Sequence, residues 1–262
     1  IDSARDIAID AAGNAYIVVR TSDTVVDYPT TPGAFDTTFN GIDDVAVTKL
    51  SPDGSTLVYS TFLGGSGIDS GTAIAVNAAG EAYVAGATTD DVIDMQTTAG
   101  AYDTTHNGVT DYFVTRFSAD GASLVYSTFI GGAGIDNAVG LAIDGAGSAY
   151  VVGTASPGFP VTAGVVDTSV LGSSEIGASK ISPDGATLQY STFIGGNQGE
   201  SANSVAVDPA GNAYITGLNF GGDFPVTAGA YDTTFNGGND VILTVLNPSA
   251  TGYIFSTYLG GG

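Results

Sequence analysis

The segment Tyr59-Ser60-Thr61-Phe62-Leu63-Gly64-Gly65 has three close copies in this chain of 262 residues. It returns as Tyr-Ser-Thr-Phe-Ile-Gly-Gly at 126–132 and 190–196 and as Phe-Ser-Thr-Tyr-Leu-Gly-Gly at 255–261. A second signature, Ala-Gly-x-Ala-Tyr, ends at four tyrosines that are 67, 67 and 64 residues apart: Tyr16, Tyr83, Tyr150 and Tyr214. Self-similarity at a fixed period is the mark of a repeat architecture, so the chain consists of four units of about 65 residues each.

Each unit predicts four short β-strands. The first is built from small and β-branched residues, as in Asp6-Ile7-Ala8-Ile9, and an Asx-x-x-Gly turn joins it to the strand with the signature tyrosine. A third strand alternates apolar and polar residues, as at 113–117, and a Pro-Asp-Gly turn such as 52–54 leads into the Tyr-Ser-Thr-Phe strand. A loop of roughly 20 residues separates the second and third strands, which is longer than ordinary hairpin loops.

Four strands per unit, with small residues in the first strand and glycines at the exit, describe a β-propeller blade. We therefore predict an all-β fold: one β-propeller domain over residues 1–262, with four four-stranded blades at approximately 1–65, 66–132, 133–196 and 197–262. A parallel β-helix has shorter coils without paired hairpin turns. A βαβ fold needs helices, and the sequence predicts none of useful length.

Three repeated motifs resemble the SBBP family, the bacterial and archaeal β-propeller repeat. They are Tyr-Ser-Thr-Phe-x-Gly-Gly, Ala-x-Asp-x-x-Gly-Asn-Ala-Tyr and, at 224–234, Phe-Pro-x-Thr-x-Gly-Ala-Tyr-Asp-Thr-Thr. All four units carry the pattern, so the resemblance covers essentially the full chain. It implies an extracellular module of a large secreted or cell-surface prokaryotic protein, and it supplies no catalytic motif.

The family name evokes seven blades, whereas this chain has four, so three arrangements stay open. Four blades could close into one ring, two chains could form an eight-bladed ring, or each chain could continue the next in an open assembly that forms a filament. The chain begins at Ile1 and not at Met, which we expect of a secreted protein after signal removal or of a segment taken from a longer polypeptide.

The charge balance excludes several partners. The chain has 27 acidic residues against five Lys or Arg, so its formal net charge is −22 and its pI is near 4.1. Binding to a nucleic-acid backbone needs clustered cations, and an anionic membrane surface would repel such a protein. There is no cysteine for a disulfide or a thiolate metal site. No apolar run approaches the length that a membrane span requires.

Most of the acidic residues recur at fixed positions of the unit, chiefly where turns favour Asp because its carboxylate accepts backbone N–H groups. One set precedes the first strand of each unit: Asp2, Asp69, Asp136 and Glu200. In a closed ring these carboxylates would surround one mouth of the channel, where oxygen ligands suit calcium. The alternative is that each acid caps its own blade. We treat the set as a candidate cation ring with Ca²⁺ as its ion, and predict no other cofactor.

The residues for catalysis are scarce. His106 is the only histidine and its repeat equivalents include Phe39 and Phe235, so it occupies a scaffold position, and triads or histidine zinc sites are excluded within one chain. The acidic group that comes nearest to breaking the repeat, Asp90, Asp91 and Asp94, is interpreted as a solvated loop and not as a glycosidase carboxylate pair.

We therefore predict a non-catalytic extracellular or cell-surface protein with a structural or adhesive role, as the subunit of an assembly or filament. Its partners would be further copies of itself or other cell-surface components, and the long loops are the expected contact sites. The alternative is a secreted propeller that binds or cleaves a polysaccharide, with glycans as its ligands.

Overall fold

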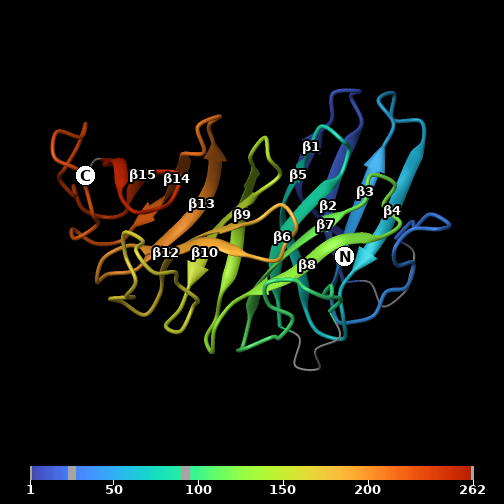
Figure 1. Ribbon diagram of the computed structural model, residues 1–262, viewed down its shortest axis with the longest axis horizontal. Helices are drawn as coiled ribbons and strands as arrows, with labels where there is room; N and C mark the ends of the chain where they lie inside the picture. The colour runs from blue at the N-terminus through green and yellow to red at the C-terminus, as the bar shows by residue number, and fades with distance from the viewer. Residues whose placement is uncertain (1, 23–27, 90–94, 261–262) are drawn as a thin grey trace. The chain divides into compact units, whose positions relative to one another are not determined.

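The computed structural model describes residues 2–22, 28–89 and 95–260, and these form sixteen β-strands (Figure 1). They make four antiparallel sheets of four strands, each in chain order. Sheet 1 contains β1 (Asp2–Ile9), β2 (Ala15–Thr21), β3 (Asp44–Leu50) and β4 (Leu57–Leu63). Sheet 2 contains β5 (Asp69–Val76), β6 (Ala82–Thr88), β7 (Asp111–Phe117) and β8 (Leu124–Ile130).

The same order continues in the second half of the chain. Sheet 3 contains β9 (Asn137–Ile143), β10 (Ala149–Ala155), β11 (Glu175–Ile181) and β12 (Leu188–Ile194). Sheet 4 contains β13 (Glu200–Val207), β14 (Ala213–Asn219), β15 (Asp240–Leu246) and β16 (Tyr253–Leu259). These sheets confirm the prediction of an all-β fold with four strands per repeat and a long connection between the second and third strands. No helix among the described residues is long and apolar enough to span a membrane.

The chain divides into two compact units, which we describe separately. Unit 1 comprises Ile1–Ile130 with Asp184–Ala186, and therefore holds sheets 1 and 2. Unit 2 comprises Gly131–Pro183 with Thr187–Gly262, and holds sheets 3 and 4. The predicted single domain and the closure of a ring stay predictions.

The turn between the first two strands is held by its own aspartate. Asp10 Oδ1 accepts hydrogen bonds from the N–H groups of Ala12 at 3.0 Å and Asn14 at 2.9 Å, and Gly13 adopts a φ of +85°. Left-handed backbone of this kind favours glycine because a Cβ would collide with the following carbonyl. Asp144 and Asp208 accept the same two bonds in sheets 3 and 4, so the Asx-x-x-Gly motif forms a hairpin turn as predicted.

The interior of each unit lies between its two sheets. In unit 1, β5 packs against β1, β2 and β3, and in unit 2, β13 packs against β9, β10 and β11. The signature tyrosine links the two sheets: Tyr16 Oη lies 3.1 Å from Asp10 Oδ2 in its own sheet and donates to Gly80 O, also at 3.1 Å, in the next. Its ring lies 4.7 Å from Lys49 Nζ, a favourable cation–π contact.

Candidate functional site

A carboxylate at the start of each third strand is fully buried. Each accepts the backbone N–H of the residue four positions earlier, so it fixes the end of the preceding long loop. The distances are 2.8 Å for Asn40 to Asp44, 2.9 Å for Asn107 to Asp111, 2.5 Å for Leu171 to Glu175 and 2.9 Å for Asn236 to Asp240. These four acids recur at one position of the repeat, but their burial is a property of the packed sheets.

Three members of the candidate cation ring have a similar role. Asp69, Asp136 and Glu200 are buried and accept N–H groups of the Gly-Gly exit at 2.7, 2.8 and 3.1 Å, whereas Asp2 is exposed on β1. Asp2 and Asp69 lie in unit 1, and Asp136 and Glu200 in unit 2. Over the described ranges, no group of three or more His, Cys, Asp or Glu side chains is arranged to hold a metal ion. The ring of four therefore stays a prediction.

Within each unit the structure brings together carboxylates from two of the periodic sets. A Cβ added to Gly64 would lie 2.8 Å from Asp69 Oδ2 and 2.9 Å from Asp44 Oδ1, so both carboxylates face the same glycine. In unit 2, Glu175 and Glu200 meet in the same way at Gly195. Both pairs are separated by 25 residues in the sequence, and this constant spacing is the signal by which the pairing could have been found.

The electrostatics of these pairs favour a retained proton. Burial raises the pKa of Asp44 to about 7, and the neighbouring Asp69 carboxylate adds to the effect. Burial likewise raises the pKa of Glu200 to about 7, with Glu175 adding to it. Like charges in a low dielectric cannot both ionise cheaply, so the neighbouring carboxylate favours the protonated form of Asp44 and of Glu200. Because the four side chains are buried, they suit a structural role and not attack on a substrate.

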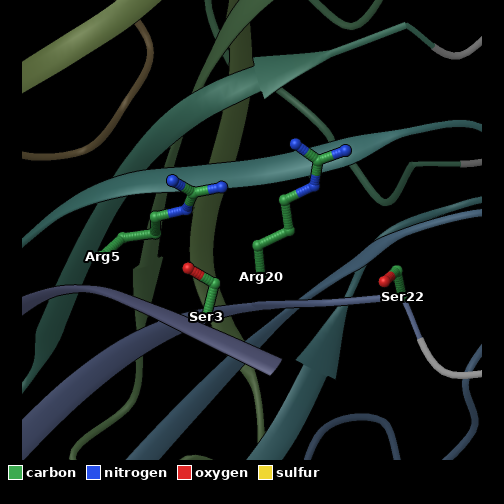
Figure 2. A pocket seen from close by; sticks show the side chains of 4 residues that line it. All are labelled: Ser3, Arg5, Arg20 and Ser22. Atoms are coloured by element: carbon green, nitrogen blue, oxygen red, sulfur yellow. The ribbon is translucent and has the colours of Figure 1, made fainter. Parts of the chain in front are cut away.

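A second candidate site is a pocket of about 290 Å³ on sheet 1, lined by Ser3, Arg5, Arg20 and Ser22 (Figure 2). Arg20 Nε donates to Asp43 Oδ2 at 3.0 Å. Arg5 is the extra residue of a β-bulge between Ala4 and Asp6 and is exposed; among the salt bridges of the described residues it takes part in none. Asp43 also forms a salt bridge with the Arg20 guanidinium and offsets its charge, so Arg5 is the main cation that could bind a carboxylate or sulfate here. The sequence does not reveal this pocket, because Arg5 and Arg20 are brought together only by the pairing of β1 with β2.

His106 packs as a scaffold residue. Its ring makes an edge contact with Phe129, with 6.0 Å between ring centroids, and its Nε2 lies 3.3 Å from the carbonyl oxygen of Thr88. Asp90, Asp91 and Asp94, the acidic group of the second unit's long loop, lie outside the described residues.

Comparison with protein families agrees with this geometry. The SBBP model, described as a beta-propeller repeat, matches residues 189–224. The matched segment runs from β12 through β13 and β14 to Phe224, and it confirms the resemblance there. No curated protein sequence matches the chain.

Solved structures resemble the chain in fold alone. A protein of unknown function from Dyadobacter fermentans aligns with a TM-score of 0.51 at 15% identity, covering 99% of this chain and 70% of that one. A mutant of the Synechocystis apocarotenoid oxygenase aligns with a TM-score of 0.46 at 10% identity over 99% of this chain. The present chain spans 50% of the length of that oxygenase.

Proposed function

We propose that this protein is a non-catalytic extracellular β-propeller module with a structural or adhesive role, in which the four sheets are the blades. The observation that carries the proposal is that the buried carboxylates and the signature tyrosines make hydrogen bonds that hold the sheets together. The buried carboxylates accept backbone N–H groups at equivalent positions of successive repeats, and the signature tyrosine links one sheet to the next. A site for chemistry would depart from the repeat, whereas a scaffold reproduces it.

Negative-stain electron microscopy of the purified chain tests the structural role, because it reports the blade count and the assembly state together. Rings, sheets or filaments are the expected result. Binding of the same purified protein, after labelling, to the surface of cells of the organism that produces it tests the adhesive role and the extracellular location. Monodisperse particles that do not bind cells would contradict both roles.

Calcium at the ring of Asp2, Asp69, Asp136 and Glu200 is the proposed metal site. Thermal unfolding with added Ca²⁺ and with EDTA, together with elemental analysis, tests it. A bound ion stabilises the folded state by an amount that grows with its concentration above Kd. Equal melting temperatures in both solutions and no metal in the protein would exclude the ring.

The arginine pocket favours a second candidate function, namely binding or cleavage of an acidic polysaccharide. Glycan-array binding restricted to uronic-acid or sulfated sugars would support it, and release of reducing ends would separate cleavage from binding. Arg5→Ala should abolish the array signal, whereas Arg5→Lys should retain part of it because the charge remains. Unchanged binding by both variants would rule out this pocket.

A further inference from the structure

The two units repeat one sheet-to-sheet interface. We call the face of a sheet with the signature tyrosine its front face, which carries Tyr16 and Val45 in sheet 1, and the opposite face its rear face. In unit 1 the front face of sheet 1 packs on the rear face of sheet 2, where Ile74 is buried. In unit 2 the front face of sheet 3 packs on the rear face of sheet 4 in the same way.

Two polar contacts recur in both copies of this interface. The signature tyrosine hydroxyl of the first sheet in each unit donates to a glycine carbonyl in the first turn of the second sheet, at 3.1 Å in unit 1 and 3.5 Å in unit 2. A backbone N–H in the long loop of the first sheet donates to a carbonyl in the second turn of the second sheet. This second bond is 2.9 Å from Phe35 to Gly121 and 2.8 Å from Val166 to Ala250.

The front face of sheet 4 is partly open, although Val245 and Thr257 on the same face are buried. Val241 is 41% exposed, whereas its equivalent Val45 is completely buried. Tyr214 and Leu259 are exposed beside it, although Tyr16 and Leu63 at the same positions of sheet 1 are fully buried. Tyr231, which corresponds to Phe35, is 89% exposed. Along β14, buried residues therefore alternate with residues of the front face that are exposed, as Tyr214 is, or half-buried.

On sheet 1, the part of the rear face that would pack on such a front face is exposed. Ile7 on its rear face is 61% exposed, whereas the equivalent Ile74 of sheet 2 is 4% exposed. The second turns show the same contrast. A Cβ on Gly121 would lie 2.5 Å from the ring of Tyr59, whereas a Cβ on Gly54, with the same φ of +68°, would have no atom within 4 Å.

We propose that the front face of sheet 4 binds the rear face of sheet 1 of a second copy of this chain. The proposal rests on the proposed structural role and names its partner and contact surface. The front face of sheet 4 and the rear face of sheet 1 are both exposed in the same chain, so a second copy can supply the missing neighbour of each face. The sheet-to-sheet interface that recurs in units 1 and 2 fixes which residues meet in this contact. Tyr214 then donates to the Gly13 carbonyl of the second copy, and the Tyr231 N–H donates to that copy's Gly54. The contact is heterologous, so copies add head to tail.

Salt should promote this association. Each copy carries a formal net charge of −22, so approaching copies repel one another until counterions screen the charge. The contact itself is mainly apolar, which ionic strength does not weaken.

Disulfide trapping tests the register directly, because the chain has no cysteine of its own. In unit 1 the corresponding contact places the Cβ position of residue 71 at 2.8 Å from Val45 Cγ1. The double variant Ala4→Cys with Val241→Cys should therefore give a ladder of multimers on a non-reducing gel after mild oxidation. Internally linked monomer, or no link, would overturn the proposal. Ala4→Cys with Val125→Cys is the control for chance collision, since Val125 stays 43% exposed on the docked rear face of sheet 2.

Sedimentation of blocked variants gives an independent test. Val241→Asp and Ile7→Asp should each lower the association constant at least tenfold, and an equimolar mixture of the two should form 1:1 dimers through the one intact interface. Val125→Asp should assemble like the unmodified chain. Assembly unchanged in both blocked variants would overturn the proposal, as would an unmodified chain that stays monomeric at high salt. A monomer that still binds cell surfaces would leave the proposed adhesive role standing.

Discussion

Two glycines offer a matched measurement of what sheet-to-sheet packing contributes. Gly54 and Gly121 occupy the same place in the second turn of sheets 1 and 2, and both have a φ of +68°. Alanine at either position strains the backbone equally. Only at Gly121 does the new methyl group also meet a neighbour, the ring of Tyr59 at 2.5 Å.

The expected magnitudes follow from these two terms. A left-handed alanine costs about 1–2 kcal/mol relative to a normal conformation, and Gly54→Ala should lose about that much. Gly121→Ala should lose a further 1–3 kcal/mol or so, the usual cost of overpacking. Tyr59 cannot move aside easily, because it is 2% exposed and its ring packs edge-on against Tyr16 with centroids 6.3 Å apart.

Urea unfolding followed by circular dichroism at low protein concentration measures both losses, since the chain has no tryptophan to follow. Gly121→Ala should show the lower midpoint in the transition of unit 1. Equal midpoints for the two variants would refute the argument that Tyr59 and the second turn form a close-packed contact. At high concentration Gly54→Ala should also weaken self-association, because Gly54 lies in the proposed docking face.

Three further predictions concern hydrogen bonds and protons. Because burial raises the folded-state pKa of Asp44 and Glu200 to about 7, above the value in an unfolded chain, the stability they contribute is complete below about pH 4 and is lost as the pH rises through 7. Melting temperatures should therefore fall from pH 5 to pH 8, and Asp44→Asn or Glu200→Gln should flatten that slope; an unchanged slope would contradict the raised pKa values of Asp44 and Glu200. Tyr16→Phe should cost about 1 kcal/mol in urea titrations because it removes the hydroxyl that donates to the Gly80 carbonyl and lies 3.1 Å from Asp10 Oδ2. Tyr214→Phe, whose hydroxyl makes only a 3.4 Å contact to Asp208, should cost less, and equal losses would count against the bridging role of the Tyr16 hydroxyl. Ser127→Ala should cost about 1–3 kcal/mol by the same assay, because the buried hydroxyl of its partner on β7, 2.7 Å away, loses its bond; a loss near zero would show that this partner has another bond.

The strands and turns could be predicted because their causes are local. Alternation along 113–117 and the Asx-x-x-Gly turn after Ile9 depend on neighbouring residues only, and both appear as strand β7 and the Asp10 turn. Because the motifs recur in four repeats, the same strand and turn predictions apply to each repeat, and together they predict four sheets.

The site residues could be found only as periodic sets. Asp69 and Glu200 recur at one position of the repeat and Asp44 and Glu175 at another, and nothing local in the sequence joins the two positions. Their pairing depends on how a loop at the end of one sheet lies against the start of the next, which involves residues 25 positions apart. Burial of these carboxylates is likewise a property of the packed unit.

The sequence by itself determined the repeat, because the recurring motifs can be read along the chain, and it determined the strand type and the turn chemistry, because these depend on neighbouring residues. Only the tertiary structure decided which faces are covered. Val45 and Val241 occupy equivalent positions in similar strands, yet one is buried and the other exposed. The difference lies in whether a neighbouring sheet packs on that face, and packing between sheets is a relation between distant segments that no local pattern encodes.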